Sequence, residues 1–258
     1  NKLKEWGVRH STKIGKTGIV AQIIGTKGNS KASIGLRADI DALPIEELND
    51  FNYKSKNKGV SHKCGHDGHT SMLLGAVKYL SENPNFNGVV NFIFQPAEEG
   101  QGGARVMIEE GLFKKFPMEQ VFGMHNWPEV EKGKFSICSG PIMAGANTIQ
   151  IKITGFGGHA AMPHQTIDPI IVGSHIVTAL QTVSSRTINP MDNIVLSITQ
   201  FHAGTTHNII PNEVFLEGSL RTLSDSTKET AVKKIDEIVK NIAKGFSAEA
   251  EFSIDKGY

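Results

Sequence analysis

The chain has few cysteines, no excess of charge and no long apolar run. Only two of its 258 residues are cysteine, and 27 basic residues stand against 26 acidic ones. The two thiols, Cys64 and Cys138, suit a reducing cytosol better than a disulfide-stabilised secreted protein. A net charge of +1 gives no overall field that would attract nucleic acid or an anionic membrane. No apolar run approaches the length of a membrane span, and the first five residues do not open a signal peptide. We therefore expect a cytoplasmic globular protein without nucleic-acid or membrane partners.

Several common catalytic signatures are absent or incomplete. Neither H-E-x-x-H nor G-x-S-x-G occurs, so the zincin and α/β-hydrolase interpretations lose their signatures. Gly15-Lys16-Thr17 resembles the end of a P-loop, but His10 occupies the position of the first glycine. Residues 155–160 fit a dinucleotide fingerprint. However, Pro163 interrupts the helix that should follow, and no acidic residue lies about 20 positions further on to bind a ribose. Nucleotide chemistry is not supported.

What the chain does contain is a dense group of metal-ligand residues. Residues 61–69, Ser-His-Lys-Cys-Gly-His-Asp-Gly-His, hold one thiol, three imidazoles and one carboxylate. Burying such groups unpaired costs on the order of several kcal/mol, so we interpret Cys64 and His66 as metal ligands. His62 and His69 are equally well explained by local hydrogen bonding. Because no second Cys/His pair follows at similar spacing, the pattern favours a catalytic site over a structural zinc knuckle.

The first half of the chain alternates short apolar runs with helical patterns. We expect strands at 17–25, 33–38, 89–94 and 120–124, and helices at 68–81 and 103–110. This alternation indicates a largely parallel sheet covered by helices on both faces. Polar residues that follow these strands should gather at the carboxyl edge of the sheet, where the sites of open α/β sheets lie. They are Asp39, Asp41, Glu98, Glu99 and His125.

A second unit begins near Gly145. We expect strands at 147–154, 193–199, 213–220 and 250–254, and helices at 168–184 and 227–246. The resulting order, β-α-β-β-α-β, is that of a ferredoxin-like unit. The predicted organisation is a first domain over 1–144, the second over 145–255, and a return toward the first at 256–258.

The adjacent carboxylates of Glu98 and Glu99 are suited to two different roles. Neighbouring residues that leave a strand point in different directions, so one carboxylate can bind metal while the other faces water. The second would act as a general base and later as a general acid toward a leaving amine. A solvated pair of surface acids is the alternative. The pair directly follows an apolar strand and precedes a glycine-rich turn, and this context supports the catalytic interpretation.

Five motifs in the order of the chain resemble the M20 metallopeptidase family, and specifically its amidohydrolase branch of hippurate hydrolases, N-acyl-amino-acid deacylases and auxin-conjugate hydrolases. They are Leu-Arg-Ala-Asp-Ile-Asp-Ala-Leu-Pro at 36–44, Cys-Gly-His-Asp-Gly-His at 64–69, Gln-Pro-Ala-Glu-Glu-Gly at 95–100, Gly-His-Ala-Ala-Met-Pro-His at 158–164, and Asn-Ile-Ile-Pro at 208–211 followed by Gly-Ser-Leu-Arg at 218–221. The resemblance implies a zinc-peptidase-like α/β catalytic domain with an inserted ferredoxin-like lid.

The resemblance also implies two divalent ions, zinc or manganese. Their implied protein ligands are Cys64, His66, Glu99 and His125, with Glu98 as the acid/base and Asp41 as a carboxylate that orients a ligand. In the lid, His159 resembles a histidine that stabilises the oxyanion, in related dimers at the active site of the partner subunit. Asn208 and Arg221 resemble groups that hold the free carboxylate of the substrate. For Arg221, a surface charge at a strand end is the alternative.

The implied reaction cleaves the amide bond of an N-acyl amino acid to a carboxylic acid and a free amino acid, in a homodimer formed through the lid. The alternatives are a dipeptidase or aminopeptidase of the same fold, and an inactive truncated metal-binding relative. Family members carry a further metal-binding histidine in a C-terminal segment, whereas this chain stops at residue 258. We therefore expect the catalytic domain to be incomplete here and the chain to be part of a longer enzyme.

Overall fold

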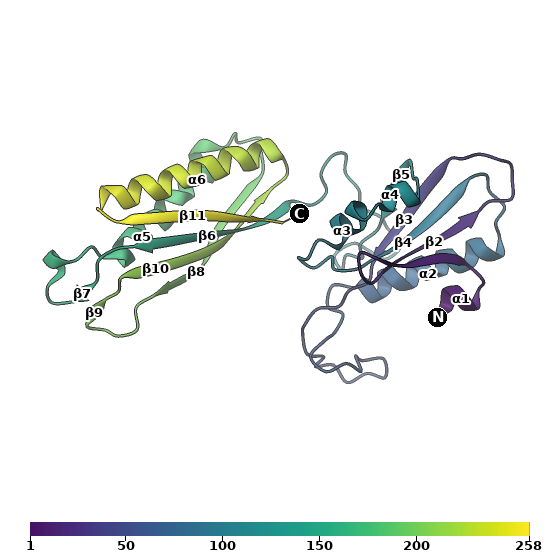
Figure 1. Cartoon of the computed structure of the whole chain (residues 1–258), viewed down its shortest axis with the longest axis horizontal. Helices are drawn as coiled ribbons and strands as arrows, with labels where there is room; N and C mark the ends of the chain where they lie inside the picture. The colour runs from purple at the N-terminus through teal and green to yellow at the C-terminus, as the bar shows by residue number, and fades with distance from the viewer. Residues whose placement is uncertain (258) are drawn as a thin grey trace. The chain divides into compact units, whose positions relative to one another are not determined.

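The computed structural model describes residues 1–257 and divides the chain into two compact units. Unit 1 is Asn1–Phe135, and unit 2 begins at Ser136, somewhat before the predicted domain boundary at 144/145. Each unit has its own sheet and its own buried apolar core (Figure 1). Among residues 1–257, no helix combines the length and the apolar character needed to cross a membrane.

Unit 1 contains a mixed five-stranded sheet in the spatial order β1-β2-β4-β3-β5. Its strands are β1 (Arg9–Ile14), β2 (Gly18–Ile24), β3 (Ser33–Asp39), β4 (Val89–Gln95) and β5 (Gln120–Gly123). β3 pairs in parallel with both β4 and β5, while β1–β2 and β2–β4 are antiparallel. The prediction of a largely parallel sheet is therefore right for β3, β4 and β5 and wrong for the other edge.

The antiparallel edge was not predicted because β1 has no apolar alternation. Its sequence, Arg-His-Ser-Thr-Lys-Ile, leaves only Ile14 buried. The chain then reverses through Gly15 and Lys16, whose φ angles of 64° and 66° lie in the left-handed region. Left-handed backbone is typical of tight turns. Gly15-Lys16-Thr17, which resembles the end of a P-loop, therefore belongs to a hairpin turn.

Helices cover both faces of the unit 1 sheet, as predicted. The short α1 (Lys2–Glu5) and the long α2 (His66–Glu82) lie on one face, where Leu73 and Val77 of α2 belong to the same buried cluster as Phe92 of β4. The short helices α3 (Gly103–Glu109) and α4 (Leu112–Lys115) bury Met107 and Leu112 in a second cluster with Ile93 of β4. β4 is thus apolar on both sides, as expected of a central strand.

Unit 2 contains a four-stranded antiparallel sheet in the order β11-β6-β10-β8. Its main elements follow the chain as β6 (Gly145–Thr154), α5 (Pro169–Thr182), β8 (Ile194–Ala203), β10 (Glu213–Thr222), α6 (Asp225–Gly245) and β11 (Glu249–Lys256). A π-helical turn, η2 (Val183–Thr187), extends α5. A single apolar cluster joins the buried side of the sheet to α5 and α6. The predicted order of strands and helices is therefore observed.

Two smaller features of unit 2 bear on the predicted site. A two-stranded ribbon pairs β7 (Gly158–His159) with β9 (Ile209–Ile210), and the 3₁₀ turn η1 (Pro163–Gln165) follows β7. Within the segment 256–258, Lys256 ends β11 and Tyr258 lies outside the described residues. The predicted return toward the first domain at 256–258 stays a prediction.

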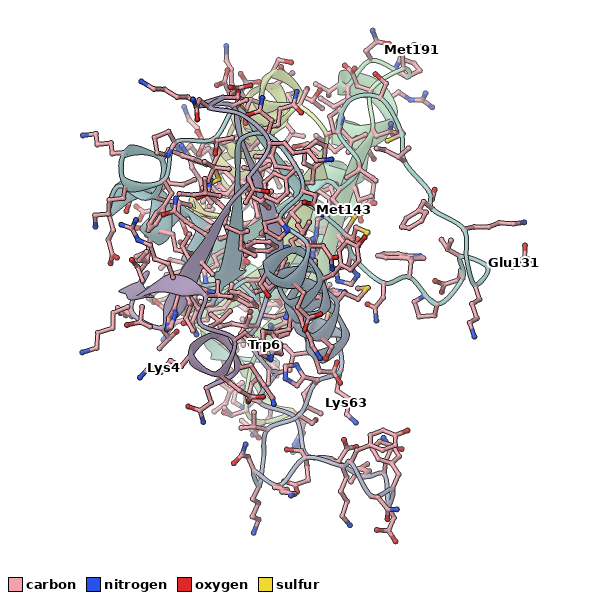
Figure 2. The ribbon with its side chains drawn as sticks, turned by 90° about the vertical axis from the view of Figure 1, so that its right-hand side faces the viewer. Lys4, Trp6, Lys63, Glu131, Met143 and Met191 are labelled. Atoms are coloured by element: carbon pink, nitrogen blue, oxygen red, sulfur yellow. The ribbon has the colours of Figure 1, made fainter. Side chains whose placement is uncertain are left out.

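The segment that follows β5 extends outward from unit 1, with Glu131 near its tip (Figure 2). Its apolar side chains are open to solvent: Trp127 is 50% exposed and Phe135 is 84% exposed. Lys63 marks the place where another long segment returns to α2, and its ammonium group pairs with the carboxylate of Glu47 at 2.7 Å. Both segments flank the carboxyl edge of the sheet.

We predict that Ile235→Ala lowers the free energy of unfolding of unit 2 by about 2–5 kcal/mol, because Ile235 is fully buried between α6 and the sheet. Denaturant titration followed by circular dichroism measures the change. Lys233→Ala on the exposed side of α6 is the matched control and should change the free energy by less than about 0.5 kcal/mol. Equal effects of the two substitutions would contradict the assigned core.

Candidate metal centre

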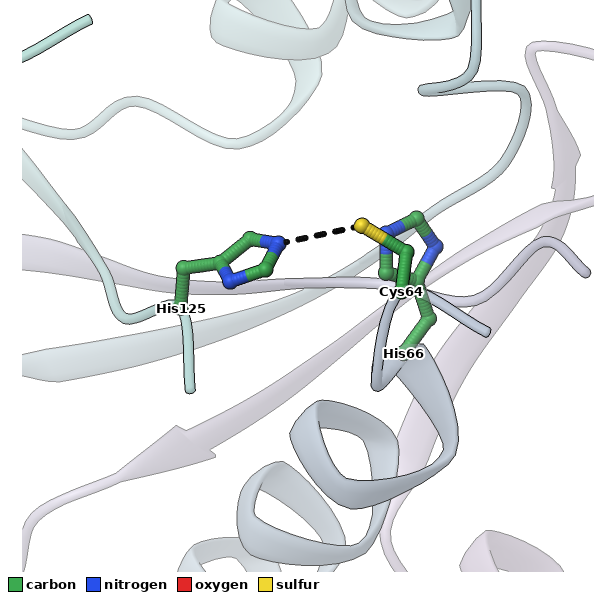
Figure 3. Close-up of side chains that lie close together, drawn as sticks. All are labelled: Cys64, His66 and His125. Carbon is green, nitrogen blue, oxygen red and sulfur yellow. Dashed lines mark hydrogen bonds between the residues drawn. The ribbon is translucent and has the colours of Figure 1, made fainter. Parts of the chain in front are cut away.

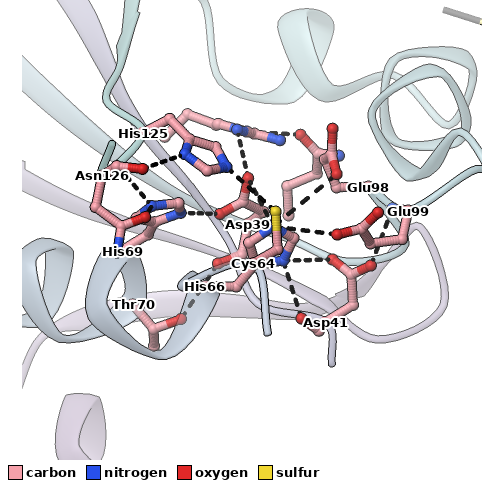
Figure 4. A network of polar contacts seen from close by, with 12 residues as sticks. Asp39, Asp41, Cys64, His66, His69, Thr70, Glu98, Glu99, His125 and Asn126 are labelled. Carbon is pink, nitrogen blue, oxygen red and sulfur yellow. Dashed lines mark hydrogen bonds and ion pairs between the residues drawn. The ribbon is translucent and has the colours of Figure 1, made fainter. Parts of the chain in front are cut away.

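The candidate metal centre lies where three parallel strands end together. Asp39 is the last residue of β3, Glu98 and Glu99 follow β4, and His125 follows β5. The amino-terminal end of α2 meets the same edge and brings His66, with Cys64 just before the helix. Figure 4 shows the resulting network of carboxylates, imidazoles and one thiol. The predicted gathering of polar residues at the carboxyl edge is therefore observed.

Cys64, His66 and His125 bring soft and borderline ligand atoms together from distant parts of the chain. One ligand atom from each lies within 4.8 Å of the others, and Sγ of Cys64 is 3.4 Å from Nε2 of His125 (Figure 3). The His125 Nδ1–H donates to the backbone carbonyl of Asn126 at 2.7 Å, which leaves the Nε2 lone pair facing the thiol. Thiolate and neutral imidazole are the ligands that zinc prefers.

His66 is the residue whose environment is most unusual. Its ring is 1% exposed, and its Nδ1–H donates to the backbone carbonyl of Asp41 at 2.9 Å. Nε2 therefore carries a lone pair, and this buried atom has no hydrogen-bond partner among the described residues. It lies 3.7 to 3.9 Å from three carboxylate oxygens, which belong to Asp39, Glu98 and Glu99. Lone pairs that face one another in this way are stabilised by a cation placed between them.

Asp39 at the end of β3 and Asp41 just after it orient their neighbours in different ways. Asp39 is 1% exposed and accepts a hydrogen bond from His69 at 2.6 Å and from Arg37 at 2.9 Å. Burial alone raises the pKa of Asp39, but the His69 hydrogen bond and the Arg37 charge outweigh it and lower the pKa below its ordinary value. Asp41 accepts from the backbone N–H of Glu99 at 3.1 Å, so it fixes the loop that carries Glu99.

The backbone of the loop that carries Glu98 and Glu99 is conformationally restricted. Ala97 has a φ of 52°, a left-handed value that is uncommon for a residue with a side chain. Its carbonyl accepts from the N–H of Gly103 at 2.9 Å. A Cβ atom at Gly103 would lie 1.7 Å from the carbonyl oxygen of Pro96, so only glycine fits there.

The predicted lid residues lie in unit 2 and fall into two groups. His159 is in β7, and the backbone N–H of its neighbour Ala160 donates to the carbonyl of Asn208 at 3.0 Å, so these two predicted residues lie on the same ribbon. Arg221 is near the other end of β10, beside Ala146 and Val195. The extended chain from the ribbon end of β10 to Arg221 spans about 27 Å. All three side chains are exposed.

Two residues with undecided roles are separated by their burial. His62 is exposed and belongs to none of the ligand groups found among the described residues. His69 is 2% exposed, and both ring nitrogens have partners, with Nδ1 on Asp39 and Nε2 on Asn126. Sequence reasoning assigned no role to Arg37, Gln95 or Asn126. Residues 95 and 126 border the loops of Glu98 and His125, which was the available signal.

The thiol of Cys64 should respond to pH in an unusual way. Burial raises its pKa, and the nearby carboxylates of Glu99, Glu98 and Asp39 raise it further, to about 11. Without metal, only about one Cys64 side chain in a thousand is a thiolate at pH 8. We predict that iodoacetamide modifies Cys64 of the metal-free protein slowly at pH 8, and that the rate rises about tenfold per pH unit toward pH 11.

Mass spectrometry of the modified peptides measures this rate. The exposed Cys138 is an internal reference, and a Cys138→Ser variant removes competition for the reagent. Modification of Cys64 as fast as Cys138 at pH 8, or a rate that does not change with pH, would contradict the raised pKa.

Comparisons with known proteins agree with this geometry. The family profile described as Peptidase family M20/M25/M40 matches residues 35–253. The chain is 46% identical to the hippurate hydrolase of Campylobacter jejuni over 252 residues, which cover 98% of the chain and 65% of that protein. It is 44% identical to the N-acyl-L-amino acid amidohydrolase of Geobacillus stearothermophilus, over 99% of the chain and 69% of that protein. The chain thus spans about two thirds of the length of these relatives.

A solved structure supports the fold as well. The Bacillus subtilis YXEP protein, described as a dinuclear metal binding peptidase from the M20 family, superposes with a TM-score of 0.82 at 34% identity, over 99% of this chain and 65% of that one. Together with the matched profile and the motifs at the carboxyl edge of the unit 1 sheet, these similarities show that the chain belongs to peptidase family M20/M25/M40.

Proposed function

We propose that this chain provides the metal centre of a cytoplasmic amidohydrolase that cleaves N-acyl amino acids to a carboxylic acid and a free amino acid. The buried, unpartnered Nε2 of His66 carries the proposal, because it faces three carboxylates and needs a cation between them. The substrate class is supported by the two relatives named as a hippurate hydrolase and an N-acyl-L-amino acid amidohydrolase.

The donor set fits two divalent ions. The ions would be held by Cys64, His66, Glu99 and His125. Oε1 of Glu99 lies 3.8 Å from Nε2 of His66. The thiol favours zinc, whereas the carboxylates and imidazoles also suit manganese. Bound ions of this kind polarise an amide carbonyl and lower the pKa of a coordinated water. The backbone carbonyls of Asp41 and Asn126 fix the imidazole tautomers that this requires.

Glu98 is placed to move the proton. Its side chain is 43% exposed, so it reaches solvent and substrate, while Oε2 lies 3.9 Å from Nε2 of His66. In the proposed reaction, this carboxylate takes a proton from the attacking water and passes it to the departing amide nitrogen. Glu99 is less exposed and is tied through its backbone N–H to Asp41, which suits a ligand rather than a mobile base.

Unit 2 would serve as a lid and dimerisation domain with a ferredoxin-like order of elements. We assign oxyanion stabilisation to His159 and substrate carboxylate binding to Asn208 and Arg221. The separation of Arg221 from Asn208 along β10 means that unit 2 of one chain does not bring these two side chains to the same carboxylate. A homodimer, in which the ribbon of one subunit serves the site of its partner, accounts for this separation.

We predict that Glu98→Gln lowers kcat by about 10²- to 10⁴-fold, because the amide cannot accept the proton of the attacking water. Metal content should be unchanged, since Glu98 is not an assigned ligand. A ninhydrin assay of amine release and inductively coupled plasma mass spectrometry measure the two quantities.

Glu82→Gln, an exposed residue near the end of α2, is the matched control and should keep full activity. Hippurate and N-acetyl amino acids should be better substrates than a dipeptide. Full activity of Glu98→Gln with metal bound would refute its role, and faster cleavage of the dipeptide would favour a peptidase of the same fold.

A further inference from the structure

A line of polar side chains crosses the carboxyl edge of the unit 1 sheet. Oε1 of Gln95 accepts from Nε of Arg37 at 2.7 Å, and Nη1 of Arg37 donates to Oδ2 of Asp39 at 2.9 Å. Oδ1 of Asp39 accepts from Nδ1 of His69 at 2.6 Å. Nε2 of His69 accepts from the backbone N–H of Asn126 at 2.9 Å. We call these five residues the polar chain.

Each end of the polar chain borders a loop with proposed metal ligands. Gln95 is the last residue of β4 and precedes the loop of Glu98 and Glu99. Asn126 directly follows His125. In the middle of the polar chain, Arg37 and Asp39 belong to β3 and His69 belongs to α2. Figure 4 shows His69 between Asp39 and Asn126. The polar chain therefore joins the two loops through four side chains and the backbone N–H of Asn126.

The hydrogen bonds of the polar chain that reach Gln95 and Asp39 have a fixed direction. Arginine only donates and a carboxylate only accepts, so His69 carries a proton on Nδ1. Its Nε2 lies 2.9 Å from both the backbone N and the side-chain Oδ1 of Asn126. Asp39, His69 and Gln95 are each at most 5% exposed. A buried network in which every member is satisfied is rigid and resists rearrangement. Both ring nitrogens of His69 have polar partners, and one of them also lies within 4.8 Å of ligand atoms of Asp39 and His66.

Close packing also holds the loop that carries His125 and Asn126. A Cβ atom at Gly65 would lie 2.3 Å from the side chain of Asn126, so α2 approaches this loop as closely as a glycine allows. The ring centroids of His69 and His125 are 4.5 Å apart in an edge-to-face arrangement. A shift of Asn126 would therefore carry the imidazole of His125 away from Cys64.

We propose that the polar chain sets the separation of the two ligand loops, with Arg37 and His69 as positioning residues. Its effect on metal binding rests on the proposed function, whereas its effect on the loop of His125 does not. Loss of either residue should loosen the loop and weaken metal binding without removing a ligand.

The test uses Arg37→Met, His69→Leu and the double variant. Hydrogen exchange of the Asn126 amide in the metal-free protein should be about tenfold faster in each variant. Zinc affinity, measured by competition with a chromophoric chelator, should fall by about 10- to 100-fold. Because both substitutions break the same network, the zinc affinity of the double variant should be no lower than that of the single variant with the lower affinity. Arg9→Met, an exposed arginine on β1 of the same sheet, is the matched control and should change neither quantity.

Unchanged exchange and unchanged affinity in a folded Arg37→Met protein would overturn the proposal, as would additive losses in the double variant. If His69→Leu does not fold, Arg37→Met decides, because its side chain is 25% exposed and its removal leaves no void in the core. If neither this chain nor a form with the full length of its relatives binds zinc, the proposed function fails. The exchange of Asn126 then still tests the polar chain.

Discussion

The parallel pairing of β3 with β4 and β5 is the constraint on which unit 1 depends. The register sets Asp39 opposite Gln95 and Arg37 opposite both Ile93 and Gly123. Three chain segments therefore leave the sheet at one edge and in one direction, and their first polar residues meet. A catalytic metal keeps one position open for water or substrate, whereas a structural metal has all four positions filled by protein ligands.

Much of this edge could be predicted from the sequence. The apolar run of β4 and the polar residues directly after each strand indicated both the strands and where their ends would meet. The orphaned Nε2 of His66 could not be predicted, because it depends on which carbonyl accepts from Nδ1. The burial of His69, in contrast to His62, could have been predicted. Its spacing from His66, Leu73 and Val77 places it on the buried face of α2.

Unit 2 shows the opposite balance. The order of its longer elements was predictable because those strands and helices have a clear apolar period, and Pro169 and the capping Asp168 mark the start of α5. The ribbon of β7 and β9 was not predicted, since two-residue strands carry no period. The large distance between Arg221 and Asn208 could have been predicted from the length of the strand expected between them. The assignment of both residues to one carboxylate rested on motifs and did not use that length.

Ala97 shows how the loop of Glu98 and Glu99 limits the variation that the protein can accept. A left-handed backbone costs a residue with a Cβ on the order of 1 kcal/mol, and a β-branched residue considerably more. Glycine and asparagine tolerate this conformation, whereas valine, isoleucine and threonine do not. Substitution at position 97 is therefore restricted by backbone geometry even though its small side chain performs no chemistry. Selection on the two carboxylates extends in this way to a neighbour that neither binds nor reacts.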